Sequence, residues 1–246
     1  MNLIPDGIAM NKYRFTFLLF FTCFFCQGFS AVLPVFSGFL QGETSGQDTA
    51  KGNQILYNGR IWRNLYAQVR ENQFLFAPDF LTGSVTIRGK VFDNVSLKYD
   101  IFKDELLTAS DPGGILQINK ERVDSFSLLF ENKRYLFVSL PDSANGTHGY
   151  FNLIYNGHLA FYRKYIKRID KLSVDGQSDR FYQFYRLYLW KDNELFLVTG
   201  KNDLLDKFKE QKALIKTYIK KNSLDVSAKE PESFIPLIRY IESIGR

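Results

Sequence analysis

The chain has 246 residues, enough for one large domain or two small ones. Its 24% charged and 16% aromatic residues exclude a wholly disordered chain and favour a β-rich fold with a sizeable core. The net charge of +6 is spread along the chain without a long Lys/Arg block, so nucleic acid is not an expected partner.

The N-terminal segment has the order of a secretory signal peptide. Lys12 and Arg14 precede an apolar run at residues 15–25, and small residues follow at Gly28 and Ser30. This run is shorter than an ordinary membrane-spanning helix. We therefore expect an exported protein, periplasmic or associated with the outer membrane, that does not span the membrane once the signal is removed.

The start and the processing of this segment leave alternatives open. Met10 can replace Met1 as the true start, because the residues before it add nothing that a signal needs. A lipoprotein modified at Cys26 is the rival to a cut after Ser30, although bulky residues precede that cysteine. Cys23 and Cys26 both lie inside the signal, so the mature chain is expected to use no disulfide, thiolate metal site or cysteine nucleophile.

The rest of the chain divides by composition. After a signal peptide at residues 1–30, residues 31–53 are predicted to be a flexible leader, because they are rich in glycine and lose periodicity. Residues 54–200 are predicted to form an antiparallel β domain, and residues 201–246 a helical segment packed on it. Many strands followed by two helices indicate the α+β class, with the strands in a curved sheet or a partly open barrel or roll.

Residues 83–109 show the clearest strand pattern in the β domain. Apolar and polar side chains alternate there, which places one set on a buried face and the other in water. Gly89 and the Asp93-Asn94 pair predict turns, Asn156-Gly157 predicts a type I′ hairpin, and residues 74–80 predict a short strand interrupted by a proline. Further strands are predicted at residues 115–118, 123–130, 135–140, 150–155, 159–169, 181–190 and 194–198.

Two helices are predicted after these strands. Asn202 or Asp203 can cap a helix that runs to about Asn222, with apolar residues at helical spacing. A second helix begins at about Pro231, where proline suits the first turn.

The central pattern resembles a family of uncharacterised secreted proteins from Bacteroidetes-type bacteria. The resemblance is carried by turn glycines, strand positions and the lysine-rich helix: Tyr57-Asn58-Gly59, Gly83-x-Val85, Gly89, Val95-x-Leu97-x-Tyr99-Asp100, Tyr155-x-Gly157 and Leu204-Leu205. It implies a periplasmic or envelope location and brings no catalytic residues.

Histidines offer a weak signal for chemistry. His148 and His158 are the two histidines, and each is predicted to lie in a loop without carboxylate partners at metal-ligand spacing. A triad of Ser143, His148 and Asp142 lacks a nucleophile elbow, and neighbouring loop residues rarely converge in space. Exposed loop residues are the favoured interpretation, and no metal or cofactor is predicted.

Acidic pairs are the other candidates for catalysis. Asp100 with Asp104, or Asp104 with Glu105, could act as general acid and base. Asp100 falls on the polar side of its strand and the other two residues resemble a turn, so a solvated surface is favoured.

In the strand predicted at residues 181–190, successive side chains point to opposite faces, so one face carries Tyr182, Arg186, Tyr188 and Trp190. Both faces of the strand are largely apolar, which favours coverage on both sides, in part by the C-terminal helices. If one face is open, these four residues are the predicted binding site, with the aromatic side chains as a stacking platform.

Together these patterns favour a non-catalytic binding or scaffolding protein of the cell envelope, with another envelope protein as a possible partner. The alternatives are a module that binds glycans or lipids through the aromatics at residues 182–190, and a hydrolase that uses loop carboxylates.

Overall fold

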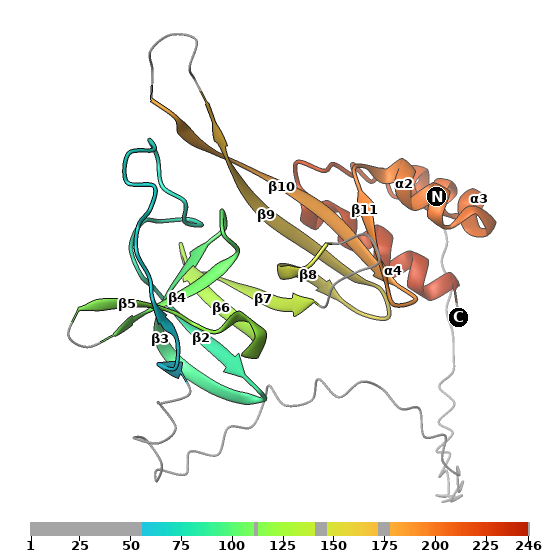
Figure 1. Cartoon of the computed structure of the whole chain (residues 1–246). Coiled ribbons are helices and arrows are strands. Elements are labelled where there is room, and N and C mark those ends of the chain that lie inside the picture. The colour runs from blue at the N-terminus through green and yellow to red at the C-terminus, as the bar shows by residue number, and fades with distance from the viewer. Residues whose placement is uncertain (1–55, 111–112, 141–146, 172–177, 246) are drawn as a thin grey trace, which may run out of the picture. The chain divides into compact units, whose positions relative to one another are not determined.

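The computed structural model describes residues 56–110, 113–140, 147–171 and 178–245. Within them, eleven antiparallel strands form one sheet in the order β1-β5-β4-β3-β2-β6-β7-β8-β9-β10-β11 (Figure 1). The two outermost strands, β1 and β11, each pair with one neighbour, so the sheet is open. The strands are β1 (Arg60–Ile61), β2 (Leu81–Ile87), β3 (Lys90–Asp100), β4 (Glu105–Ser110), β5 (Gly114–Gln117), β6 (Val123–Phe130), β7 (Lys133–Leu140), β8 (Gly149–Asn156), β9 (Ala160–Asp170), β10 (Arg180–Lys191) and β11 (Glu194–Val198).

The C-terminal part of the described chain is helical, which confirms the predicted α+β class. Its helices lie beside β8–β11, away from β2–β5 (Figure 1). None of the described helices has both the length and the apolar character needed to cross a membrane. The α-helices are α2 (Lys201–Lys207), α3 (Lys212–Lys221) and α4 (Ile235–Ile244), and the 3₁₀ turns are η1 (Lys120–Arg122), η2 (Lys209–Gln211) and η3 (Pro231–Phe234).

Tight turns set the register of three hairpins. In the β2–β3 turn, Arg88 and Gly89 have φ of 50° and 77°. The two central residues of the β6–β7 turn and of the β10–β11 turn also have positive φ. Two consecutive left-handed residues are the signature of the type I′ turn, whose twist matches that of the strands it joins. The prediction of a turn at Gly89 is therefore confirmed.

Three local predictions were wrong. The Asp93-Asn94 pair lies inside β3, where Asn94 has a φ of 55° and the pairing with β2 shifts register, so it forms a bulge. The short strand predicted at residues 74–80 does not form, and only Phe74 pairs there, through a single bridge to Asp100. The type I′ turn predicted at Asn156-Gly157 is instead a three-residue loop between β8 and β9, because Asn156 pairs with Ala160. Gly157 in this loop leaves space for Glu242 of α4.

The sheet curls so that the β3–β4 turn reaches β8 and β9. The backbone carbonyl of Ile101, in that turn, accepts a 3.5 Å bond from the N–H of Lys167 on β9. The Nζ of Lys167 donates to the backbone carbonyls of Asn72 and Phe74, at 2.6 Å each. Burial lowers the pKa of Lys167 to about 8.

Aromatic rings fill the inside of the curl. Tyr99, Phe126, Phe137 and Tyr150 come from four strands and are each 1% exposed. The rings of Phe126 and Phe137 stack with centroids 4.7 Å apart, and Tyr99 packs edge-on against both.

A second core lies between the strands and the helices, and we call it the helix-side core. It contains Phe161, Leu187 and Leu189 from β9 and β10, together with the apolar faces of α2, α3 and α4. Polar contacts between the strands and the helical segment include two that use glutamates. Glu232 accepts a 3.0 Å bond from Arg163, and Glu242 accepts a 2.6 Å bond from the hydroxyl of Tyr155.

The first predicted helix is broken, which corrects the expectation of one helix running to about Asn222. The chain leaves α2 at Phe208, with φ −110° and ψ 55°, passes through η2 and resumes as α3. No glycine or proline lies between Asn202 and Asn222 to signal this break. The second predicted helix begins near Pro231 as expected, with one 3₁₀ turn before α4.

Several predictions concern residues outside the described ranges. The signal peptide at residues 1–30, the leader at residues 31–53, the two cysteines, Asp142 and Ser143 all fall there.

Candidate functional site

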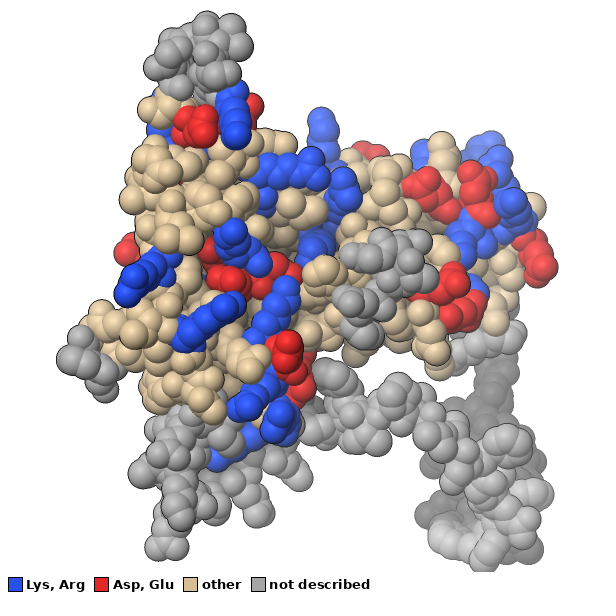
Figure 2. Space-filling model, viewed as in Figure 1, with Lys and Arg blue, Asp and Glu red and all other residues tan. Residues whose placement is uncertain are grey.

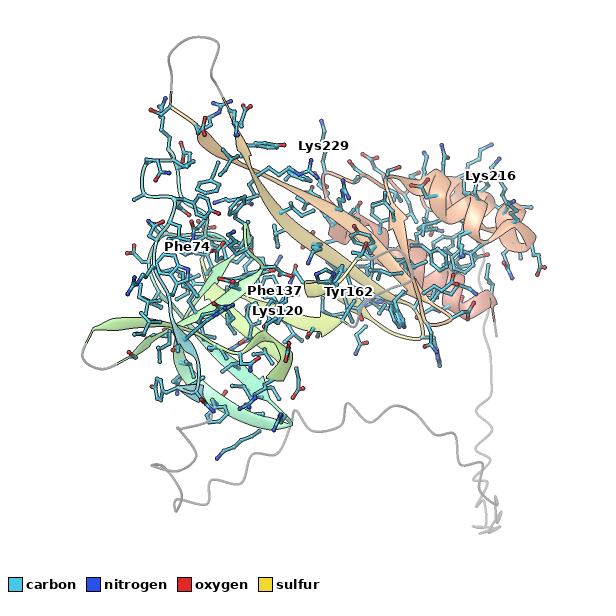
Figure 3. The ribbon with its side chains drawn as sticks, viewed as in Figure 1. Phe74, Lys120, Phe137, Tyr162, Lys216 and Lys229 are labelled. Atoms are coloured by element: carbon cyan, nitrogen blue, oxygen red, sulfur yellow. The ribbon has the colours of Figure 1, made fainter. Side chains whose placement is uncertain are left out.

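Asp104 is the centre of a charged network at the point where the sheet curls. Its Oδ1 accepts bonds from the hydroxyl of Tyr99 at 2.6 Å and from the N–H of Tyr150 at 3.4 Å. Its Oδ2 accepts bonds from the Nζ of Lys120 at 2.7 Å and from the Nζ of Lys164 at 3.3 Å. Lys120 lies on η1 and is labelled in Figure 3. We call these residues the Asp104 network.

Gly149 lets the carboxylate of Asp104 approach the start of β8. A side chain at position 149 would overlap Oδ2 of Asp104, and the backbone there has a φ of 97°. Both facts require glycine, because other residues avoid this conformation and would also fill the space.

The network pairs one carboxylate with two ammonium groups, which leaves a net positive charge. Burial alone would raise the pKa of Asp104, but Lys164, Lys120 and the Tyr99 hydroxyl hold that pKa below its usual value. Burial lowers the pKa of Lys164 and raises the pKa of Tyr150. With both carboxylate oxygens accepting bonds from the chain itself, Asp104 joins β3–β4 to β8, β9 and η1, a structural role.

Asp100 is fully buried, with 0% of its surface exposed. Its oxygens accept bonds from Gln73 Nε2 at 2.6 Å and from the N–H groups of Phe102 and Lys103 at 3.0 Å. Burial nevertheless raises the pKa of Asp100 to about 6, despite these three donors.

The prediction that the acidic residues lie on a solvated surface was therefore wrong for Asp100. It does not describe Asp104 either, because that side chain is largely buried. The long-range curl of the sheet places both residues inside. A local signal was available, because an aspartate at a strand end often caps the N–H groups of the following turn, as Asp100 does for Phe102 and Lys103.

The two histidines are exposed in the described loops. Among the described residues, no group of three or more His, Cys, Asp or Glu side chains is placed to hold a metal ion.

The long strands β9 and β10 form a ribbon that projects past its neighbours (Figure 1). Because directly opposed residues point to the same side, the register fixes which side chains meet on the face away from the helix-side core. Three opposed pairs make up what we call the outer ribbon face: Arg168 with Tyr182, Ile166 with Phe184, and Lys164 with Arg186.

The outer ribbon face presents aromatic and cationic groups to solvent. Tyr182 is 41% exposed and stacks on Phe184, with ring centroids 5.8 Å apart and an interplanar angle of 22°. The guanidinium of Arg168 lies 5.4 Å from the ring centre of Phe184. Arg168 and Arg186 are both exposed.

Two of the four predicted binding residues lie further along the same face, where it is buried. Tyr188 is 6% exposed and packs edge-on against Phe151, with centroids 5.6 Å apart, and Trp190 is half-buried. The helices cover the opposite face of β10, through Leu187 and Leu189. The end of β10 that holds Tyr188 and Trp190 is therefore covered on both sides, as expected from the sequence. Tyr182 and Arg186, nearer the start of β10, are accessible to solvent.

Like charges face each other at one pair of the ribbon. Lys164 and Arg186 are directly opposed, an arrangement that destabilises a sheet. Lys164 shares the carboxylate of Asp104 with Lys120, whereas Arg186 forms no ion pair or hydrogen bond with any residue that the structure describes. Figure 2 shows that Lys and Arg outnumber Asp and Glu over the ribbon and the central strands on the visible side. Arg186 therefore presents an unbalanced positive charge beside the Tyr182–Phe184 stack.

Comparison with known proteins identified no relative. No family model, no curated protein and no solved structure matches the chain. The resemblance to secreted proteins of Bacteroidetes-type bacteria stays a prediction.

Proposed function

We propose that this chain is an exported, non-catalytic binding or scaffolding protein of the cell envelope, and that the outer ribbon face contacts an anionic envelope component. The observation that carries the proposal is Arg186, which is exposed, lies opposite another cation and has no acidic partner among the described residues. An anion supplied from outside would give Arg186 a counter-ion, as Asp104 does for Lys164.

An acidic glycan is the ligand that best fits this face. Aromatic faces pack against sugar rings, and the planar guanidinium of arginine binds carboxylate or phosphate groups with two parallel hydrogen bonds. Tyr182 and Arg186 are four residues apart on one strand, which corresponds to about 13 Å. A chain of a few sugar units could therefore contact both.

The remaining parts of the proposal rest on different observations. Export is supported by the order of charged, apolar and small residues before residue 31. Binding is favoured over hydrolysis because the carboxylate of Asp104 is saturated by four donors and Asp100 is fully buried.

A titration of the purified mature chain with polygalacturonate tests the site. We expect saturable binding that weakens as salt is added, because exposed charges are screened. Arg186→Gln and Tyr182→Ala should each weaken binding about tenfold, since each removes one polar or stacking contact. Lys216→Gln removes the same charge from an exposed position on α3 (Figure 3) and should leave the affinity unchanged.

Neutral dextran is the control for the charge of the glycan and should bind at least tenfold more weakly than polygalacturonate. Equal affinity of the wild type and Arg186→Gln for polygalacturonate would show that the outer ribbon face is not the contact. Turnover of a glycan, lost in Asp104→Asn, would instead favour a hydrolase.

A further inference from the structure

The sheet ends at β1, and one side of this strand has no neighbouring strand among the described residues. β1 pairs antiparallel with β5, with Ile61 opposite Leu116, and the N–H of Trp62 donates to the carbonyl of Ile115 at 2.8 Å. Successive residues of a strand direct their backbone groups to opposite sides, so the N–H and C=O of Ile61 point away from β5. Free backbone groups at a sheet edge can accept a strand from another chain.

Apolar side chains are exposed along the same edge. Tyr57, Ile61 and Leu65 are 45%, 74% and 69% exposed, and the last two are the most exposed large apolar side chains that the structure describes. Single exposed apolar residues are common on protein surfaces. Three of them close together beside free backbone groups are typical of an interaction site. The edge is also held in place, because Arg60 Nε donates to the side-chain carbonyl of Gln117 at 2.8 Å.

The charges along this edge are positive. Residues 56–70 contain three arginines and no acidic residue. Arg60 and Arg63 are both exposed, and neither forms an ion pair with a residue that the structure describes. Arg60 lines a pocket together with Lys120 and Glu121, so the one carboxylate of that lining faces two cations. The edge therefore favours an acidic partner and disfavours a second copy of itself, whose arginines would be brought close to these.

We propose that β1 accepts an extended segment of another protein as a further strand of the sheet, and that this segment is acidic. The N–H and C=O of Ile61 form the backbone hydrogen bonds, and the exposed apolar side chains pack against those of the added strand. This edge and the outer ribbon face use no residue in common, so each can be tested independently of the other.

The register of β1 specifies which residues the added strand should carry. In an antiparallel pairing, an apolar residue lies opposite Ile61. The next residue of the partner lies opposite Arg60, and the residue two positions earlier lies opposite Arg63. The motif that fits is therefore acidic, any residue, apolar, acidic.

Calorimetric titration of the mature chain with the peptide acetyl-Leu-Thr-Glu-Thr-Val-Glu-Thr-amide tests the proposal. We expect saturable binding of one peptide per chain. Lysine in place of both glutamates should weaken binding about tenfold, because like charges then lie opposite Arg60 and Arg63. N-methylation of the central valine removes the N–H that bonds to the carbonyl of Ile61, and should also weaken binding about tenfold.

Amide hydrogen exchange measured by NMR shows where the peptide binds. The N–H of Ile61 should exchange about tenfold more slowly in the complex, because it gains a hydrogen bond to the added strand. The N–H of Trp62 already donates to Ile115 and is the internal control, so its exchange should change little.

Variants of the edge test the contacts of the side chains. Ile61→Asp places a carboxylate between the two glutamates of the peptide and should abolish binding. Leu214→Asp, the same change at a 53% exposed position on α3, and Arg186→Gln, on the ribbon, should both bind as the wild type does. The double variant Arg60→Glu/Arg63→Glu should bind the lysine peptide more tightly than the glutamate peptide. Unchanged melting temperatures without peptide verify that the variants fold.

Three results would overturn the proposal: no saturable binding of the glutamate peptide, equal affinity for the lysine peptide, or no added protection of the Ile61 N–H at saturating peptide. The two altered peptides and the exchange measurement use the wild-type chain, so they decide the matter even if a variant fails to fold. Dimerisation of the wild type without peptide, lost in Ile61→Asp, would show that a second copy occupies the edge and would contradict an acidic partner.

Discussion

The Asp104 network and the outer ribbon face use the same kinds of side chain with opposite results. Both combine cations with aromatic rings, and Lys164 on β9 belongs to both. In the network, Lys164 and Lys120 bind one carboxylate and lie near the rings of Phe151 and Tyr150, respectively. On the outer ribbon face, Arg186 is exposed and has no acidic partner among the residues that the structure describes.

We infer that burial and pairing, and not residue type, separate this structural ionic site from the proposed binding surface. A buried charge must be paired inside the chain, because leaving it unpaired costs several kcal/mol. An exposed cation can stay unpaired at little cost in water, and it remains available for a partner. The first kind of site should control stability, and the second should control binding.

The largest expected effect is the loss of the carboxylate at the centre of the network. Asp104→Asn leaves the ammonium of Lys164 without its counter-ion in a mostly buried position. We expect a loss of about 3 to 5 kcal/mol in the free energy of unfolding, measured by urea denaturation. Asp206→Asn removes a carboxylate from an exposed ion pair with Lys212 and should cause no measurable change. Equal effects of the two variants would contradict a structural role for Asp104.

Asp100 should make stability depend on pH in the opposite direction to a paired carboxylate. A pKa raised from 3.8 to about 6 means that the folded state favours the protonated form. The stability that Asp100 contributes to the fold is therefore fully present below pH 3.8 and is lost as pH rises through about 6. The free energy of unfolding should fall by about 3 kcal/mol over this range.

The variant Asp100→Asn should lack this dependence. It can keep the bonds from Phe102 and Lys103, and the amide of Gln73 can rotate to offer its oxygen. Urea denaturation of both proteins between pH 4 and 8 measures the difference. A constant difference between wild type and variant across this range would contradict a raised pKa for Asp100.

Sequence patterns predicted most of the strands and the face on which each proposed binding residue lies, because both depend on neighbours along the chain. Alternation placed Tyr182 and Arg186 on one face together with Tyr188 and Trp190. It could not show which of them are accessible, since Tyr188 is covered by contacts with residues distant in sequence, such as Phe151.

Long-range contacts also explain the failures. The burial of Asp100 and Asp104 depends on the curl of the sheet, which brings β3–β4 to β8 and β9. The break at Phe208 opposes the local helical preference and depends on packing in the helix-side core. The capping of the turn by Asp100 has a local signal, but the long-range burial and the helix break are not encoded in a short sequence window.

Two glycines provide a smaller and more selective test. Gly149 and Gly89 both have left-handed backbone, with φ of 97° and 77°, but only Gly149 has Asp104 in the space that a side chain would fill. Gly89→Ala should cost about 1 kcal/mol for its conformation alone. Gly149→Ala should cost about 1 to 2 kcal/mol more, because it also displaces the carboxylate from its donors. Equal unfolding free energies for the two variants would contradict the close fit at Asp104.

The smallest expected effect is on the outer ribbon face. Arg186→Gln removes a repulsion between directly opposed cations, so it should stabilise the fold by about 0.3 kcal/mol. A measurable loss of stability in urea would show that Arg186 has a partner within the fold and would weaken its assignment to binding.

In-cell photo-crosslinking tests the central claim, contact of the outer ribbon face with an anionic envelope component, most directly. A photoreactive amino acid replaces Tyr182, which is 41% exposed, or Leu214 on α3, which is 53% exposed and serves as the control. We predict one dominant adduct at position 182 that contains acidic sugar, is absent at position 214 and is lost when Arg186→Gln is added. Equal adducts at both positions, or none at position 182, would contradict the account.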